Sequence, residues 1–176
     1  FWFRVSYTSA KSKKIVSIFI NPLQFNDEKD FKSYPVSLEE DFDILKKNNV
    51  DCLFMPNKEI LSDLSYQVVL PSGFSTLLCG KYRKGHFEGV YKIVKKLFDI
   101  ICPDYVFFSK KDYQQLMLIK FLIYNTKINL VECPTVRDIN GLALSSRNRH
   151  LTPEQQNIAS GIYKLMMKYK YKNEEA

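Results

Sequence analysis

The stretch "GHFEGVYKIVKKLFDIICPDYVFFSKKDYQQLMLIKFLIYNTKINLVECP" at residues 85–134 decides the fold. Apolar residues recur at helical spacing over 86–101, and a short apolar strand follows at 104–109. A second helix at 111–125 and another apolar strand at 128–134 repeat this order. Strands that alternate with helices and are apolar throughout are typical of a parallel sheet with helices on both faces. The sequence therefore predicts an α/β fold with a doubly wound parallel sheet.

The N-terminal half carries the same alternation. Its expected elements are strands at residues 14–21 and 51–56, a helix at 38–49 and a possible strand at 66–71. The first of these strands has no polar alternation, so we expect it to be buried on both faces. Ser37 and Glu40 have the spacing of a capping box, and Thr152, Pro153 and Gln155 open a last helix with the same signals.

Composition and charge limit the classes of partner. The 176 residues are 45% hydrophobic and carry a formal net charge of +7, which suits nucleic acid or an anionic small substrate. The lysines are scattered apart from a cluster at 164–172, so we interpret most of the excess as solvated helix faces and expect no nucleic-acid partner. The sequence has no run of 18 apolar residues, so we expect no membrane span.

The cysteines indicate a reducing compartment. The sequence has four of them, none at Cys-x-x-Cys spacing, and only two histidines, so we expect no protein-bound metal. Cys52, Cys102 and Cys133 lie in apolar surroundings, which favours reduced thiols in the core. Reduced thiols fit a cytoplasmic protein.

Polar side chains follow three of the predicted strands, at the edge where α/β sheets bind ligands. After the strand at 14–21 they are Asn21 and Gln24. After the strand at 104–109 they are Ser109, Lys110, Lys111, Asp112, Gln114 and Gln115. After the strand at 128–134 they are Arg137, Ser145, Ser146 and Arg147. Amides suit a substrate with hydroxyls and a carboxylate, whereas lysine and arginine suit phosphates. The sequence therefore predicts a nucleotide site beside a polar small-molecule site. His86 has no assigned role, because a capping or core position would explain it equally well.

Four stretches of the sequence also resemble a known family. They are "VSIFINPLQFNDEKDFKSYP", "GHFEGVYKIVKKLFDIICPDYVFF", "KKDYQQL" and "DINGLALSSRNRHLTPEQ" at residues 16–35, 85–108, 110–116 and 138–155. Together they resemble the pantothenate synthetase (pantoate–β-alanine ligase) family. The resemblance implies a Rossmann-like, nucleotidylyl transferase-type fold. Residues 1–148 would then form the ATP- and pantoate-binding domain, and residues 149–176 would begin a smaller C-terminal domain.

The resemblance also implies a reaction and its site. Pantoate and ATP would give pantoyl adenylate and pyrophosphate, and β-alanine would then give pantothenate and AMP. ATP is a substrate and Mg²⁺ accompanies it, and members of the family are homodimers. The implied pantoate and β-alanine ligands are Asn21, Gln24 and Gln115. The implied ATP ligands are Ser109, Lys110, Lys111, Asp112, Val136, Leu144, Ser145, Ser146 and Arg147, of which Lys111, Ser145, Ser146 and Arg147 would serve catalysis.

The sequence departs from the family at several positions. The His-x-Gly-His motif that contacts ATP phosphates is absent, and by the family's spacing it would precede Phe1, with residues 1–13 forming the next helix. Ser109 and Lys110 replace a usual Gly and a usual Glu or Gln, Lys84 replaces a Pro, and Val36 replaces an Arg. We therefore expect the chain by itself to make no pantothenate. Two alternatives stay open: a decayed relative that at most binds nucleotide, and a protein of another class, either a nucleotidylyl transferase with a different acceptor or a basic nucleic-acid-binding domain.

Overall fold

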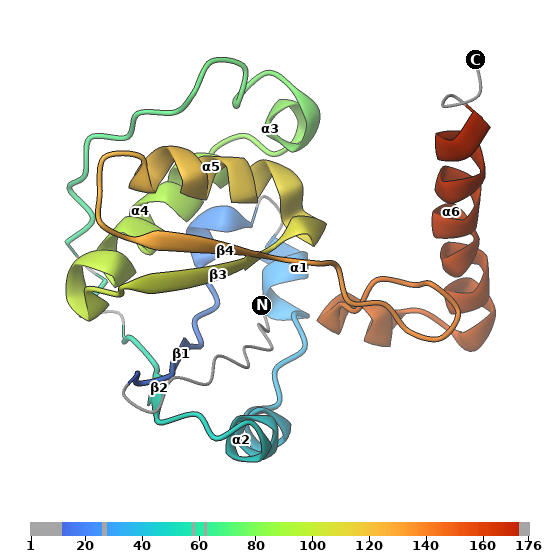
Figure 1. Cartoon of the computed structure of the whole chain (residues 1–176), viewed down its shortest axis with the longest axis horizontal. Helices are drawn as coiled ribbons and strands as arrows, with labels where there is room; N and C mark the ends of the chain where they lie inside the picture. Colours follow the sequence, from blue (N-terminus) through green and yellow to red (C-terminus); the bar gives the residue numbers. More distant parts are fainter. Residues whose placement is uncertain (1–11, 26–27, 58, 62, 173–176) are drawn as a thin grey trace. The chain divides into compact units, whose positions relative to one another are not determined.

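The computed structural model describes residues 12–25, 28–57, 59–61 and 63–172, apart from the side chains of Gln24, Asp30 and residues 170–172 (Figure 1). The expected helix at 1–13 lies almost entirely outside these residues. The chain divides into two compact units, residues 1–133 and 134–176. The domain boundary at residue 148 stays a prediction.

The best-packed part of the first unit is a parallel pair of strands, β3 (Tyr105–Ser109) and β4 (Asn129–Cys133). Helices α4 (His86–Ile101) and α5 (Tyr113–Ile123) lie beside this pair (Figure 1). A core cluster of Val106, Ile119 and Ile123 joins β3 to α5, and flanking side chains from α4 and β4 complete it. The elements expected in residues 86–134, and their parallel pairing, are confirmed.

A second core cluster ties α4 to α5. It is formed by Phe87 and Val90 of α4 and by Leu118 of α5, which has no exposed surface. Phe74, from the segment before α4, packs edge-on against Phe87 with ring centroids 5.4 Å apart. The long connection that precedes α4 is therefore fixed to the core at Phe74.

The N-terminal strands form a shorter parallel pair, β1 (Ile15–Ser17) with β2 (Cys52–Phe54). Strand β1 ends at Ser17, although Ile18 N–H still donates to the Phe54 carbonyl at 3.0 Å. Ile15 is 44% exposed, so the expectation of a strand at 14–21 buried on both faces is wrong. Residues 66–71 form no strand, and in the described ranges the four strands make two separate pairs, β1–β2 and β3–β4.

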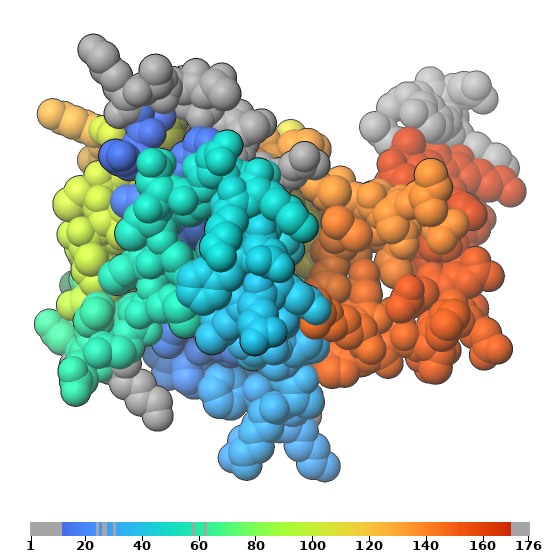
Figure 2. Space-filling model, turned by 90° about the horizontal axis from the view of Figure 1, so that it is seen from below, coloured from blue at the N-terminus to red at the C-terminus, as the bar shows by residue number. Residues whose placement is uncertain are grey.

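Two short helices accompany β1 and β2. They are α1 (Glu28–Lys32) and α2 (Leu38–Lys47), and the Ser37 side chain caps α2 by accepting from the Glu40 backbone N–H. Figure 2 shows α2 and β2, in cyan and teal, on the surface of the first unit. Large apolar side chains of α2, such as Phe42 and Ile44, are each 45% exposed.

The cysteines lie nearer the surface than the sequence predicts. All four are free thiols, but Cys52 and Cys102 are exposed and Cys133 is half-buried. Cys52 begins β2 on its open side, and Cys102 occupies the left-handed C-cap of α4 with φ of 48°. The expectation of core positions is therefore wrong for Cys52 and Cys102, because each lies where its element begins or ends.

The second unit contains a short turn and one long helix. Arg137 and Ala143 pair in an isolated antiparallel bridge, and η3 (Ser146–His150) leads to α6 (Pro153–Lys172). Thr152 and Gln155 form the expected reciprocal capping box, with bonds of 2.9 and 3.2 Å. No helix in the described part of the chain is long and apolar enough to cross a membrane.

Candidate functional site

The turn that carries Gln24 is anchored on α4. This turn, η1 (Pro22–Gln24), follows Asn21, which is only 3% exposed. The Asn21 side chain accepts from Leu23 N–H at 3.0 Å and donates to the Gly89 carbonyl of α4 at 3.0 Å. Gly89 admits this approach, because a Cβ there would lie 2.6 Å from the Leu23 carbonyl oxygen. Asn21 thus uses its amide to seat the turn, and the contact of Asn21 and Gln24 with substrate stays a prediction.

The lysines after β3 are held by neighbouring carboxylates. They belong to η2 (Lys110–Asp112), where the Ser109 hydroxyl accepts from Lys111 N–H at 3.1 Å. Lys111 Nζ lies 3.5 Å from Asp112 Oδ1, and Lys110 Nζ lies 3.7 Å from Glu132 Oε2 on β4.

Glu132 also receives a second lysine. The Nζ of Lys120 on α5 lies 2.5 Å from Glu132 Oε1. The hydrogen bond from Lys120, with the charges of Lys120 and Lys110, holds the pKa of Glu132 below its usual value. One carboxylate therefore balances two lysines, and the strand end keeps a positive excess that suits an anion.

Gln115 presents an amide for which the described part of the chain offers no partner. It lies in the first turn of α5 and is half-buried. Among the described residues its side-chain amide has no hydrogen-bond partner. By contrast, every fully buried side-chain nitrogen or oxygen atom of the described residues has a partner. The amide therefore keeps donors and an acceptor for a bound molecule.

His86 is a buried residue at the start of α4. It is 7% exposed, and its ring packs edge-on against Phe87 with centroids 4.9 Å apart. Its Nε2 lies 3.2 Å from Arg83 Nη1, just beyond the short helix α3 (Leu78–Tyr82). An arginine can only donate, so Nε2 is the acceptor in this contact. The structure therefore favours the core position for His86.

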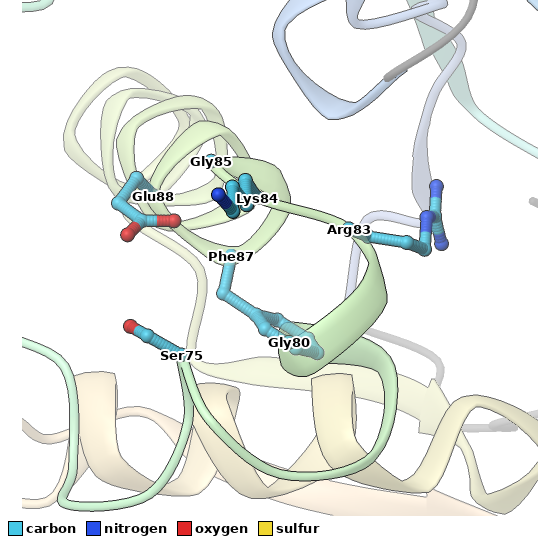
Figure 3. Close-up of a pocket in the computed structure, with 7 residues that line it drawn as sticks. All are labelled: Ser75, Gly80, Arg83, Lys84, Gly85, Phe87 and Glu88. Atoms are coloured by element: carbon cyan, nitrogen blue, oxygen red, sulfur yellow. The ribbon is translucent and has the colours of Figure 1, made fainter.

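A hollow of about 270 Å³ opens between α3 and the start of α4 (Figure 3). Its lining residues are Ser75, Gly80, Arg83, Lys84, Gly85, Phe87 and Glu88. Figure 3 shows the Arg83 side chain directed away from Lys84 and Glu88. No ligand residue expected from the sequence lines this hollow.

The remaining expected ATP ligands lie in the second unit. Leu144 N–H donates to the Val136 carbonyl at 3.0 Å, and both side chains are more than half exposed. The turn between them is closed by Asp138, which accepts from the backbone N–H groups of Asn140 and Leu142 at 2.9 Å. Gly141 occupies this turn with φ of 95°, a left-handed conformation that glycine adopts without strain.

Ser145, Ser146 and Arg147 follow directly. The Ser145 hydroxyl accepts from Arg147 N–H at 3.3 Å and so caps η3, while the Arg147 side chain is exposed. Gln156 of α6 donates to the carbonyls of Asn148 and Leu151, at 3.1 and 3.2 Å. The segment is therefore ordered by its own turn and by α6. In the described ranges no group of three His, Cys, Asp or Glu side chains could hold a metal ion.

Comparison with known proteins identifies relatives over most of the chain. A family model described as Pantoate-beta-alanine ligase matches residues 5–176. The pantothenate synthetase of Sulfurihydrogenibium sp. (strain YO3AOP1) is 43% identical over 167 residues, covering 89% of this chain and 57% of that protein. The pantothenate synthetase of Leptospira biflexa is 46% identical over 154 residues, covering 85% of this chain and 54% of that protein.

Solved structures agree with these matches. A pantoate-β-alanine ligase from Francisella tularensis, complexed with β-γ ATP and β-alanine, matches with a TM-score of 0.81 and 41% identity. The match covers 89% of this chain and 61% of that one. A pantothenate synthetase from Thermus thermophilus matches with a TM-score of 0.79 and 38% identity, covering 85% of this chain and 56% of that one.

The chain thus spans between a half and two thirds of the length of each of these relatives. These structures and the parallel strands confirm the predicted α/β, Rossmann-like fold. The chain belongs to the pantoate–β-alanine ligase family.

Proposed function

We propose that the protein condenses pantoate with β-alanine to pantothenate at the expense of ATP, through a pantoyl adenylate. The observation that carries this proposal is the 41% identity, over 89% of the chain, to a ligase solved with β-γ ATP and β-alanine. The half-buried amide of Gln115 supports it, because pantoate offers hydroxyls and a carboxylate to such a group.

The amide residues of the first unit hold the small substrates in this proposal. Gln115 and Gln24 are the proposed pantoate ligands, and Gln24 is also the proposed β-alanine ligand. Asn21 contributes by seating the turn that ends in Gln24, since its amide bonds both to that turn and to α4. A rigid turn of this kind lowers the cost of ordering a ligand.

The proposed ATP ligands are the residues that the family resemblance implies: Ser109, Lys110, Lys111, Asp112, Val136, Leu144, Ser145, Ser146 and Arg147. Lys111 and the Ser145–Arg147 stretch supply the charge stabilisation. Mg²⁺ enters with ATP and neutralises phosphate charge, and it takes its ligands mainly from phosphates and water.

The reaction needs no nucleophile from the protein. A carboxylate oxygen of pantoate attacks the α-phosphorus and pyrophosphate leaves; the amine of β-alanine then attacks the acyl carbon, loses a proton, and AMP leaves. Cations that are fixed before reaction stabilise the charge that develops at phosphorus. The main work of the chain is to position the reactants. We also infer a homodimer, as the family resemblance implies, and a cytoplasmic protein, because the cysteines are free thiols.

Arg147 provides the test of the phosphate role. We expect Arg147→Ala in the full-length protein to slow single-turnover pyrophosphate release by about 10²-fold or more, with a smaller loss of ATP affinity. Arg147→Lys should restore only part of the rate, because a point charge cannot replace a forked donor. Arg149→Ala, an exposed arginine of the same turn, is the matched control.

The outcomes separate the candidate functions. A normal adenylation rate in Arg147→Ala would overturn the role of Arg147. A wild-type protein that binds ATP but releases no pyrophosphate with pantoate would favour the second candidate, a nucleotide-binding module without catalysis.

A further inference from the structure

Gln114 makes a two-point contact with a distant part of the backbone. Its Oε1 accepts from Cys79 N–H at 3.0 Å, and its Nε2 donates to the Leu77 carbonyl at 3.1 Å. We infer that Gln114 is a positioning residue of the pantoate site, which fixes the first turn of α5 against residues 77–79 and so directs Gln115. This inference rests on the proposed function.

The contact supplies an acceptor that the start of α3 does not provide for itself. Leu77, the N-cap of α3, has no side-chain acceptor, and Asp112, the N-cap of α5, makes no side-chain capping bond. Helix starts leave backbone N–H groups unpaired unless another group accepts from them. Gln114 accepts from Cys79 N–H in α3 while itself belonging to the first turn of α5. One side chain therefore joins the two helix starts.

The backbone between the two hydrogen bonds is strained. Leu78 has φ of 49°, in the left-handed region, and its side chain is 72% exposed. Burial of an apolar side chain therefore does not stabilise this conformation. A non-glycine residue persists in such a conformation only when its surroundings hold it there. The two bonds from Gln114 flank Leu78 and hold it from both sides.

The segment held by Gln114 is fixed at its other end as well. Phe74 packs against Phe87 in the core, and a Cβ on Gly80 would lie 1.6 Å from the Phe74 carbonyl oxygen. Ser75 and Gly80, on either side of the contact, line the hollow in Figure 3. Gln114 thus fixes one wall of that hollow to α5.

Helix geometry links Gln114 to its neighbour. Successive residues of an α-helix point about 100° apart. Gln114 is hydrogen-bonded to residues 77–79, and Leu116 is packed in the core with 1% of its surface exposed. The rotation of the first turn of α5 about the helix axis is therefore fixed by the residues on both sides of Gln115. The direction of Gln115 therefore depends on the contact made by Gln114.

A double-mutant cycle in the full-length protein tests this dependence. Gln114→Leu has similar size and loses both bonds, and we expect it to raise the dissociation constant for pantoate about ten-fold while changing that for ATP by less than about two-fold. Added to Gln115→Ala, it should weaken pantoate binding by less than about two-fold further, because both changes act through one contact. Gln67→Leu, at an exposed glutamine outside the site, is the matched control.

Hydrogen exchange of the backbone amides tests the contact in the absence of any ligand. We expect Gln114→Leu to speed exchange of the Cys79 amide and to leave the Leu116 amide protected. If Gln114→Leu does not fold, Gln114→Glu replaces it, since it keeps the acceptor for Cys79 N–H and loses the donor to Leu77. That variant should retain Cys79 protection and weaken pantoate binding by a smaller factor.

The results that would overturn this inference differ from those that would overturn the proposed function. Additive losses in the double mutant, or equal losses for ATP and pantoate, would overturn the inference while the proposed function stands. Unchanged exchange at Cys79 in Gln114→Leu would also overturn it. A wild-type protein that does not bind pantoate would overturn the proposed function, and the positioning role with it.

Discussion

The two strand pairs of the first unit differ in how they are stabilised. Strands β3 and β4 pair over five residues and share a core with α4 and α5, in which Val106 is 7% exposed and Ile119 is fully buried. Strands β1 and β2 pair over three residues, and no residue of either strand is fully buried. An isolated pair of strands is only marginally stable, so each pair depends on the helices that pack against it.

The same difference applies to the site. Gln115 and residues 109–112 begin directly at β3 and α5, so the stable pair positions them. The turn that ends in Gln24 follows β1, but it is anchored by the bond from Asn21 to Gly89 of α4. Both sets of proposed ligands therefore depend on the helices α4 and α5.

Truncation of an apolar side chain should give the largest difference between the two regions in the free energy of unfolding. Leu118→Ala removes a fully buried side chain between α4 and α5, and should lower the free energy of unfolding by about 2–5 kcal/mol. Phe42→Ala in α2, where the ring is 45% exposed, should lower it by about 0.5 kcal/mol. Denaturant unfolding of both variants measures this, and similar losses would contradict the comparison.

A second variant tests the link from β1 to α4. Gly89→Ala places a methyl group 2.6 Å from the Leu23 carbonyl oxygen, and should lower the free energy of unfolding by about 1–3 kcal/mol. Gly161→Ala is the control, since its Cβ meets nothing within 4 Å on helix α6. Because alanine is the better helix former, the control should be neutral or stabilising by up to about 1 kcal/mol. An unaffected Gly89→Ala would mean that the turn is free to move off α4.

Local patterns in the sequence predicted α4 in the first unit and the start of α6 in the second. The helical spacing at 86–101 and the capping box of Thr152 and Gln155 are encoded within a few residues of each other, so sequence patterns suffice to find them. The bond from Gln114 to residues 77–79 spans 35 or more residues, and Gln114 has no local pattern that indicates it. Long-range contacts of this kind cannot be predicted from patterns within a short stretch of sequence.

Sequence patterns also failed to predict the solvent exposure of individual side chains. Cys52 and Cys102 have apolar neighbours in sequence, but their burial depends on which element covers them. The same holds for β1, whose apolar run predicted full burial. Apolar composition therefore predicted the strand but not its coverage.

The pH dependence of stability should differ between the regions. Burial opposes ionisation of Asp99 on α4, but hydrogen bonds from Lys95 and Tyr66 outweigh it and lower its pKa. Burial, followed by the bond to Asp99, raises the pKa of Tyr66 to about 12. Near β1 and β2, the backbone bond from Lys14 is the largest cause that lowers the pKa of Asp51.

The signs follow from the folded and unfolded values. A carboxyl with a lowered pKa stabilises the fold above about pH 4 and loses this effect as the pH falls through its folded pKa. Tyr66 stabilises below about pH 10 and loses this effect as the pH rises toward 12. Tyr66→Phe should therefore flatten both the acid and the alkaline limb of the stability profile, whereas Asp51→Asn should flatten the acid limb alone. An alkaline limb that is unchanged in Tyr66→Phe would contradict this assignment.

The smallest expected effect compares one cysteine from each strand pair. Cys133 in β4 is half-buried, and burial raises the pKa of its thiol, whereas Cys52 in β2 is exposed. The thiolate is the reactive form, so Cys133 has a smaller reactive fraction than an ordinary thiol, and its access is poorer than that of Cys52. In variants that keep a single cysteine, we expect a thiol reagent at pH 8 to label Cys52 faster than Cys133, by on the order of ten-fold. The two rates should converge in denaturant, because both the raised pKa and the poor access depend on the folded β3–β4 pair. Equal rates in the native protein would mean that β4 opens as readily as β2, and the difference in stability between the two strand pairs would then be wrong.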